Sequence, residues 1–296
     1  MSHVKGGLVI LKEMFNSLPP SEKKIATYIL NNPEESILLT ALTLAEKSQT
    51  SSAAVIRLCK SLGFNGFQEL KIRVAGDLQA KVVKGYRDIE PNEEYRNIID
   101  KVTSNTIQTL KETVDIMSEE SLKEAVNKLG KAKSIVFIGF GASYIAAKDA
   151  EQKFIRIDKN AQSFSDVHMA ATAIANKGPE DVVVGVTFSG NTKEVVNLLE
   201  LAKQKDSTTI SITKYGRSAV TPFSDIQLHT SAAREATFRS GATSSRIAQL
   251  HVIDILLMCL ASEEYEDTIK HLDETREAVS FLRDGVKEKK RYILKK

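Results

Sequence analysis

Two segments of this 296-residue chain place glycine and small hydroxyl residues where an apolar strand pattern gives way to a helix. They read Gly139-Phe-Gly-Ala-Ser143 and Phe188-Ser-Gly-Asn-Thr192. A junction of this kind turns unpaired backbone N–H groups and the positive end of the helix dipole toward an anion. Two such junctions in one α/β unit predict a pocket that holds a phosphate group through neutral donors.

Each junction also has an explanation that involves no phosphate. Similar glycines occur in dinucleotide-binding folds, but Tyr144 occupies the third glycine position, and no acidic residue closes a second strand about twenty residues on. These differences argue against NAD, and no cofactor is expected. Helix capping alone can account for Ser189 or for Thr192, although it does not readily account for both junctions together. Downstream, Ser244-Ser-Arg246 supplies further polar groups that can reach a sugar or its phosphate.

A second group of residues, between positions 42 and 60, has the spacing of a DNA-binding helix-turn-helix. Val55, Leu58 and Leu62 recur at helical spacing and would face the domain core. The opposite face then carries small hydroxyl residues at the helix start and two cations, which suit phosphates and base edges in a major groove. With flanking positions, the predicted DNA-binding residues are Thr50, Ser51, Ser52, Ala53, Arg57, Lys60 and Lys71. Because Gln49 replaces the glycine usual in the turn, an ordinary three-helix packing unit remains an alternative.

The elements that must position these residues fall into two classes. Up to about residue 80 the periodicity is helical, which predicts five short helices at 8–18, 21–30, 42–47, 51–62 and 67–80, the second capped by Ser21. Later, strands at 134–140, 182–188, 208–213 and 226–230 alternate with helices, which indicates a parallel sheet flanked by helices. We therefore predict a helical domain at 1–80, a linker and leading helix at 81–120, an α/β domain at 121–265, and a C-terminal helix with a basic tail at 266–296.

Composition narrows the class of protein. The net charge is +3, too small to indicate nucleic-acid binding by itself, but residues 1–84 hold 11 lysines and arginines against 7 acidic residues. No stretch approaches about eighteen uninterrupted apolar residues, and the N-terminus has no secretory hydrophobic run, so we expect no membrane span and a cytoplasmic protein. Cys59 and Cys259 lie in apolar helical patterns without metal-ligand spacing, and we expect both to be buried free thiols.

Taken together, these motifs resemble the RpiR (MurR/RpiR) family of transcriptional regulators. The resemblance spans roughly residues 4–265, and the segments that carry it are Leu18–Leu30, Ala53–Lys71, Gly139–Ser143, Phe188–Thr192 and Ser245–Leu250. It implies an N-terminal helix-turn-helix domain joined to a C-terminal SIS (sugar isomerase) domain, in a homodimer or homotetramer that binds double-stranded operator DNA. It further implies a sugar phosphate effector held by the two turns. The predicted phosphosugar-binding residues are Gly141, Ser143, Ser189, Gly190, Asn191, Thr192 and Glu235.

Three functions follow from this reading. The first is a regulator of sugar or amino-sugar metabolism whose operator affinity depends on a phosphosugar. The N-terminal half is most similar to regulators that answer to N-acetylmuramic acid 6-phosphate. The second is a phosphosugar isomerase or etherase, for which Glu235, His168 and Glu151 are the available acid–base candidates. None of the three sits in a distinctive catalytic motif, so we assign no catalytic residue. The third is a ligand-binding protein whose N-terminal helices only mediate assembly.

Overall fold

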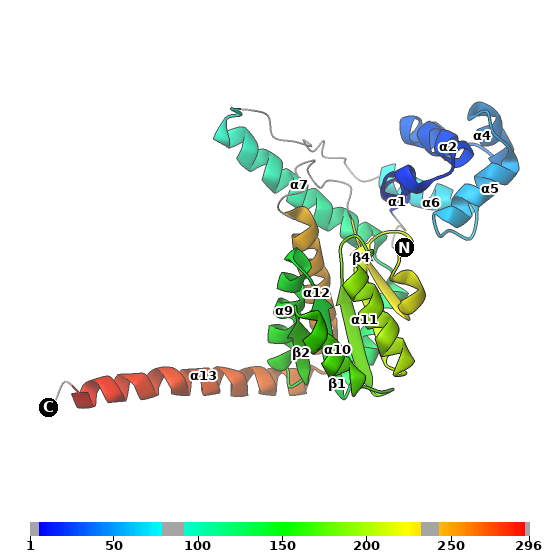
Figure 1. Ribbon diagram of the computed structural model, residues 1–296. Coiled ribbons are helices and arrows are strands. Elements are labelled where there is room, and N and C mark those ends of the chain that lie inside the picture. Colours follow the sequence, from blue (N-terminus) through cyan, green and yellow to red (C-terminus); the bar gives the residue numbers. More distant parts are fainter. Residues whose placement is uncertain (1–5, 79–91, 232–242, 294–296) are drawn as a thin grey trace.

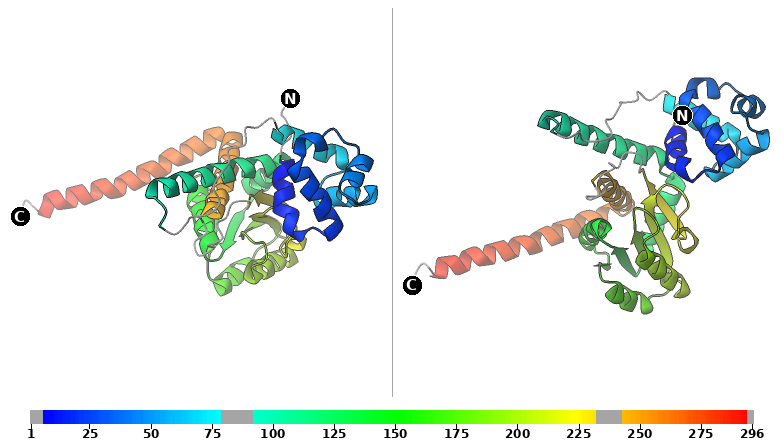
Figure 2. Two further views of the ribbon diagram at one scale, coloured as in Figure 1. Left: turned by 90° about the horizontal axis from the view of Figure 1, so that it is seen from above. Right: turned by 45° about the horizontal axis from the view of Figure 1, so that its top comes forward.

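A computed structural model describes residues 6–78, 92–231 and 243–293 (Figure 1). A bundle of short helices at the N-terminus lies against one edge of an α/β domain. A long C-terminal helix projects away from both (Figure 2). The helical domain and the parallel α/β domain agree with the predicted fold class.

The N-terminal domain is entirely helical within the described residues. Its elements are α1 (Gly7–Met14), η1 (Phe15–Ser17), α2 (Pro20–Asn31), α3 (Pro33–Ser36), α4 (Ala41–Lys47), α5 (Ser52–Ser61) and α6 (Phe67–Leu78). The short helix α3 was not predicted, because Asn32-Pro33 was read only as the end of α2, whereas Pro33 also begins the next helix. The cap assigned to Ser21 was wrong. Helix α2 begins at Pro20, whose fixed φ suits the first helical position.

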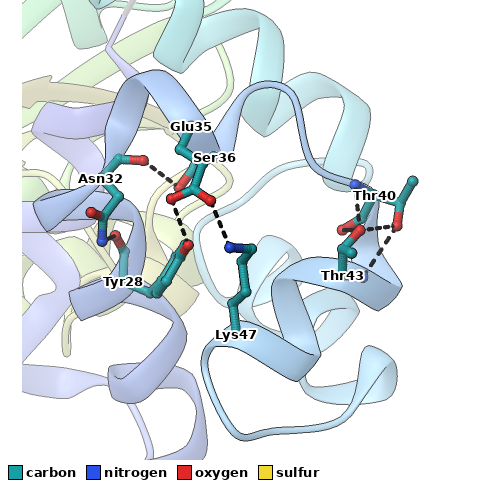
Figure 3. Close-up of polar contacts among 7 residues, drawn as sticks. All are labelled: Tyr28, Asn32, Glu35, Ser36, Thr40, Thr43 and Lys47. Carbon is teal, nitrogen blue, oxygen red and sulfur yellow. Dashed lines mark hydrogen bonds and ion pairs between the residues drawn. The ribbon is translucent and has the colours of Figure 1, made fainter.

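The helix-turn-helix helices pack as the spacing predicts. Val55, Leu58 and Leu62 are all fully buried in the core of this domain, and Ala45 is 2% exposed where α4 meets α5. The unpredicted helix α3 ties α2 to α4 (Figure 3). Glu35 on α3 accepts a hydrogen bond from the Tyr28 hydroxyl at 2.7 Å and pairs with Lys47 Nζ at 2.7 Å.

Helix α4 begins with a capping box, also drawn in Figure 3. Thr40 Oγ1 accepts from Thr43 N at 3.1 Å, and Thr43 Oγ1 accepts from Thr40 N at 3.1 Å. Two backbone donors at the helix start are thereby satisfied within the motif. The capping box and the Glu35 contacts fix the orientation of α4, and α4 in turn supports α5.

The α/β domain contains a five-stranded parallel sheet with strand order β2-β1-β3-β4-β5. The strands are β1 (Ser134–Gly139), β2 (Ala161–Phe164), β3 (Asp181–Val186), β4 (Thr208–Lys214) and β5 (Ile226–Thr230). Four of them were predicted. Strand β2 was missed because it is a four-residue edge strand with a partly exposed, polar sequence, so it lacks the continuous apolar run of a buried strand.

Helices cover both faces of this sheet. Helices α10 (Val167–Ala175) and α11 (Lys193–Gln204) belong to one face, where Val136, Val183 and Leu199 share a core cluster. Helices α8 (Glu119–Lys131), α9 (Ala142–Ile155) and α12 (Ser244–Glu263) share the other core cluster, with Phe137 and Val184. The turn η2 (Thr221–Phe223) precedes β5, and α7 (Tyr95–Ile116) crosses from the helical domain to α12. Helix α13 (Tyr265–Ile293) completes the described chain.

By length and composition alone, helix α12 could cross a membrane. Its most apolar 18-residue window has a mean hydropathy of 1.4, but 44% of that window is buried inside the protein. It packs on α7, α8 and α9, which accounts for its apolar character as that of a core helix. Cys259 on this helix is only partly buried, contrary to the prediction, whereas Cys59 is fully buried.

Candidate functional site

The strand order creates a crevice at the carboxyl ends of β1 and β3. After β1 the chain continues to β2 on one side of the pair, and after β3 it continues to β4 on the other side. In open parallel sheets, ligands bind at such a point. A cavity of about 280 Å³ opens here. Its lining residues are Phe140, Ala142, Ser143, Val186, Thr187, Phe188, Ser189, Thr192, Lys214, Ser245 and Gln249.

The cavity brings together the two turns predicted from the sequence. Ser143, Ser189 and Thr192 line it. Ser143 lies in the first turn of α9, and Thr192 is the residue before α11, so the N-termini of two helices meet at this site. Neither helix start is capped by a side chain. Within the described residues, the first-turn N–H groups of α11 are therefore available to an anion, whereas at α9 Ser143 N and Tyr144 N already donate to Phe140 O and Gly141 O, each at 3.2 Å.

The second turn shows which hydrogen bonds its hydroxyl groups make. Thr192 does not cap α11 with its hydroxyl, which instead lies 2.9 Å from Thr187 Oγ1. Ser189 Oγ accepts a hydrogen bond from Asn191 N at 3.1 Å. Simple capping, the alternative considered for Thr192, does not occur here.

Three other predicted residues shape the turns without lining the cavity. Gly141 has φ +58° and ψ −129°, a backbone conformation open to glycine. Gly190 has φ +69°, and a Cβ there would lie 2.2 Å from Ser218 Oγ. The Asn191 side chain accepts from Ala219 N at 2.9 Å, so it fastens the turn to the following loop. Glu235 and its neighbour Arg234 lie outside the described residues.

Sequence reasoning missed three polar lining residues. Thr187 precedes the second turn, and Lys214 ends β4, where its ammonium makes no hydrogen bond or ion pair within the described parts of the chain. Gln249 on α12 is 1% exposed and donates to Ser143 Oγ at 3.3 Å. Lys214 had a usable signal, since it is the polar last residue of a buried strand. Gln249 lies in the Ser245–Leu250 segment that carries the family resemblance, one turn of α12 after Ser245, but nothing in its local sequence marks it as a site residue. Ser245 lines the cavity as considered, but Arg246 does not.

The chemistry of the cavity is that of an anion site. It offers several hydroxyl groups, two helix N-termini and one lysine ammonium, and charge-assisted hydrogen bonds of this kind suit a phosphate. The lining residues that the structure describes include no aspartate, glutamate or histidine. Among the described residues, no three His, Cys, Asp or Glu side chains are grouped to hold a metal ion.

The acid–base candidates that can be located lie elsewhere. His168 is exposed on α10. Glu151 on α9 accepts from Ser163 N at 2.9 Å and pairs with Lys148. A further histidine, the partly buried His229, lines a different cavity, and its ring is tilted by 58° to that of Tyr215 with the centroids 4.9 Å apart. Burial lowers the pKa of its imidazole to about 4, so it is neutral at pH 7.

The helix-turn-helix presents the predicted cationic face to solvent. Ser51, Ala53, Arg57 and Lys60 are exposed, whereas Thr50 and Ser52 are half-buried. The structure shows no ion pair or hydrogen bond of the Arg57 and Lys60 side chains to any residue that it describes. Lys71 is half-buried and donates to Leu39 O at 3.0 Å, so its ammonium already has a partner inside the domain.

The missing glycine of the turn is accommodated locally. Gln49 has φ +52°, the left-handed conformation that glycine commonly supplies at this position. The Thr50 hydroxyl lies 2.9 Å from Ser48 Oγ, and Ser51 Oγ accepts from Ala54 N at 3.2 Å as the cap of α5. The turn thus keeps its shape, and two of the predicted DNA-binding hydroxyls serve the local structure.

Similarity to known proteins agrees with both halves. Residues 5–81 match the helix-turn-helix domain of the rpiR family, and residues 128–259 match the SIS domain. The uncharacterized HTH-type transcriptional regulator YbbH of Bacillus subtilis is 48% identical over 278 residues, which cover 94% of this chain and 98% of that protein. An HTH-type transcriptional regulator of Caldanaerobacter subterraneus is 40% identical over 93% of this chain and 97% of its own.

A solved structure is similar over nearly the whole chain. It is the NanR protein of Vibrio vulnificus complexed with ManNAc-6P, with a TM-score of 0.59 and 29% identity over 93% of this chain and 99% of NanR. On these matches, the chain belongs to the rpiR family of helix-turn-helix transcriptional regulators that carry a SIS domain.

Proposed function

We propose that this rpiR-family regulator binds operator DNA through the exposed face of α5 and that a phosphosugar in the cavity between β1 and β3 modulates this binding. The observation that supports the effector site most is the convergence of Ser143, Ser189, Thr192 and Lys214 on one cavity at two helix N-termini. A phosphate dianion would satisfy these donors together, whereas an uncharged sugar would leave the lysine unpaired.

The effector we propose is a phosphorylated N-acetyl amino sugar. N-acetylmuramic acid 6-phosphate follows from the resemblance of the N-terminal half, and the NanR structure holds ManNAc-6P. The site that would receive the phosphate comprises Ser143, Ser189 and Thr192, with the turns shaped by Gly141, Gly190 and Asn191. Lys214 is added to the residues expected from the sequence. We also propose that Glu235 binds hydroxyl groups of the sugar.

On the DNA side, α5 is the recognition helix of the proposal. Arg57 would contact guanine, and Lys60 a phosphate, with Ser51, Ser52 and Ala53 at the end that enters the groove. Lys71 is held by Leu39 O, so it would reach DNA only by leaving that carbonyl. Two copies of the helix are needed to read two half-sites, which supports a homodimer or homotetramer. We place this assembly in the cytoplasm and divide the chain at 1–80, 81–120, 121–265 and 266–296.

An isomerase or etherase activity is the competing proposal for the cavity. It needs a group that can move a proton, and the described lining offers no carboxylate or imidazole. Its test is a turnover assay by NMR with N-acetylmuramic acid 6-phosphate. Turnover that Glu235→Gln abolishes would replace the regulator proposal for this site.

The deciding experiment is a fluorescence anisotropy titration of the full chain on DNA from upstream of its own gene, with and without ManNAc-6P and N-acetylmuramic acid 6-phosphate. We expect selective, salt-dependent binding that one sugar phosphate shifts. Arg57→Ala should weaken operator binding by roughly 1–3 kcal/mol, since a good bidentate contact to guanine contributes about that much. Sugar phosphate binding should be unchanged.

The matched control is Arg156→Ala. Arg156 is exposed at the C-terminal end of α9, whereas the cavity lies at the N-terminal end of that helix. This change therefore removes the same charge from a surface that the proposal does not use. Equal losses in the two variants would show that net charge governs the binding. Operator binding by Arg57→Ala at the natural affinity would contradict the assignment of α5.

A further inference from the structure

The DNA-binding domain meets the effector domain where β4 ends (Figure 1). Tyr215 directly follows this strand and donates its hydroxyl to Leu62 O at 2.9 Å. Leu62 is the C-cap residue of α5. The Tyr215 side chain also packs against the hydrophobic core of the N-terminal domain, to which Leu58 belongs. The Tyr215 side chain, which belongs to the effector domain, is therefore hydrogen-bonded to the C-terminal end of α5, the helix that we assign to DNA recognition.

The same strand end lines the effector cavity. Lys214, the neighbour of Tyr215, is one of the cavity residues. Its backbone N–H donates to Phe188 O at 3.0 Å, and Phe188 lines the cavity in the second turn. Side chains of successive residues in extended backbone point to opposite sides. Lys214 therefore lines the effector cavity, while Tyr215, the next residue, contacts Leu62 in the DNA-binding domain. A phosphate bound by Lys214 and the second turn would shift the backbone at the end of β4, and Tyr215 is the next residue of that backbone.

The contact between the two domains is close at this point. Gly216 has φ +115°, and a Cβ there would lie 2.6 Å from Met14 Sδ. A Cβ at Gly63 would lie 3.1 Å from the Tyr215 hydroxyl oxygen. The two glycines permit the chain segments to approach until the Tyr215 hydrogen bond forms.

A second polar contact lies beside the first. Ser231 follows β5 and is hydrogen-bonded through Oγ to Glu13 Oε1 at 2.9 Å and to Glu112 Oε2 at 3.1 Å. Tyr215 N donates to Thr230 O at 3.1 Å, which joins the two strand ends. The carboxyl ends of β4 and β5 thus form the platform on which the DNA-binding domain sits.

The rest of the junction is poorly filled. A cavity of about 950 Å³ lies between the domains, lined by Ile10, Phe64 and Arg73 on one side and by Tyr215, Gln227 and His229 on the other. Burial raises the pKa of the Tyr215 hydroxyl, which therefore stays a hydrogen-bond donor at neutral pH. This cavity is open to solvent and is also lined by residues 114–119 and 121, so the direct contacts between the domains at this side are those of Tyr215 and its neighbours.

We propose that Tyr215 couples the effector cavity to DNA binding by carrying changes at the end of β4 to α5 through its hydrogen bond to Leu62 O. This inference rests on the proposed function. It assigns the coupling to a residue that touches neither the phosphosugar nor DNA. Because coupling free energy is reciprocal, the same contact governs how DNA alters effector affinity.

The test combines amide hydrogen exchange with the operator titration, on the natural chain and on Tyr215→Phe. ManNAc-6P and N-acetylmuramic acid 6-phosphate are the probes. We expect the active probe to protect residues 187–193 in both proteins and to alter exchange at 58–64 only in the natural chain. The factor by which the probe changes the operator Kd should fall at least threefold in Tyr215→Phe. The affinity of the probe for the DNA-free protein should stay within about twofold.

Tyr265→Phe is the matched control. It removes a tyrosine hydroxyl at the start of α13, where the side chain is 62% exposed and away from the junction, and it should keep the full coupling factor. Gly216→Ala is a second coupling variant, since its Cβ would meet Met14 and disturb the junction from the other side. It should lower the coupling factor as well.

The remaining outcomes separate the two proposals. If Tyr215→Phe transmits the same change to 58–64 and keeps the natural coupling factor, the role of Tyr215 is wrong while the proposed function stands. If the probe protects 187–193 but changes nothing at 58–64 in the natural chain, the role of Tyr215 is also wrong and the proposed function also stands. If neither probe protects 187–193 in the natural chain, the proposed function fails, and the inference fails with it.

Discussion

The exposed face of α5 and the cavity at the carboxyl ends of β1 and β3 are built in opposite ways. The α5 face comes from one continuous segment, and its cations point into solvent while Leu58 and Val55 on the other side fill the domain core. The cavity draws its polar groups from the ends of β1, β3 and β4 and from α12, and Gln249 among them is almost fully buried.

This difference has an energetic consequence. On α5, the residues that fill the domain core and the residues proposed to contact DNA occupy opposite faces of one helix, so a change on one face can leave the other unaffected. At the cavity, Ser189 and Thr192 make hydrogen bonds within the second turn and would also hold the ligand, so the two roles fall on the same residues there. Three variants test this comparison.

Leu58→Ala should have the largest effect. Leu58 is fully buried in the N-terminal core, and truncation of such a side chain costs about 2–5 kcal/mol through lost burial and the cavity left behind. We expect the unfolding of the N-terminal domain to move to lower temperature by calorimetry. Ile56→Ala removes a similar side chain from the same helix, but Ile56 is 41% exposed, so its loss should be much smaller. Equal losses would refute the separation of the two faces.

Lys214→Met should weaken the binding of inorganic phosphate and of ManNAc-6P by roughly 1.5–3 kcal/mol, the contribution of a hydrogen bond to a charged group. Isothermal titration calorimetry measures this loss, and the melting temperature of the free protein should change little. Lys205→Met is the control, because Lys205 is exposed at the C-terminal end of α11, away from the cavity. Unchanged phosphate affinity in Lys214→Met would remove the lysine from the site.

Thr40→Ala should have the smallest effect, about 1 kcal/mol of domain stability, because it removes the cap of α4. Operator affinity should be retained at temperatures well below the melting transition. Thr27→Ala is matched, since the exposed Thr27 hydroxyl bonds only Lys23 O within α2 and its loss should be near neutral. Chemical denaturation followed by circular dichroism resolves the two. A large loss of operator affinity in Thr40→Ala would mean that α4 contributes directly to DNA binding.

Prediction from the sequence succeeded where a local pattern carries the information. Helical spacing placed Val55, Leu58 and Leu62 in the core, and continuous apolar runs located β1, β3, β4 and β5. It failed for α3 and β2, which are too short to show a period. Gln49 weakened the helix-turn-helix prediction, yet the structure holds it in the left-handed conformation that the turn requires.

The sequence by itself determined the two classes of domain, the two turns with their hydroxyl residues, and the cationic face of α5, because each depends on neighbours within one or two helical turns or one strand. The tertiary structure decided which of those residues share a cavity. It brought Lys214 and Gln249 to the cavity beside the turns. It left Asn191 out of the cavity lining, with its side chain bonded to Ala219 N. It also placed Tyr215 against Leu62, a contact between residues far apart in the chain. Such contacts arise from the packing of whole elements, and no local spacing records them.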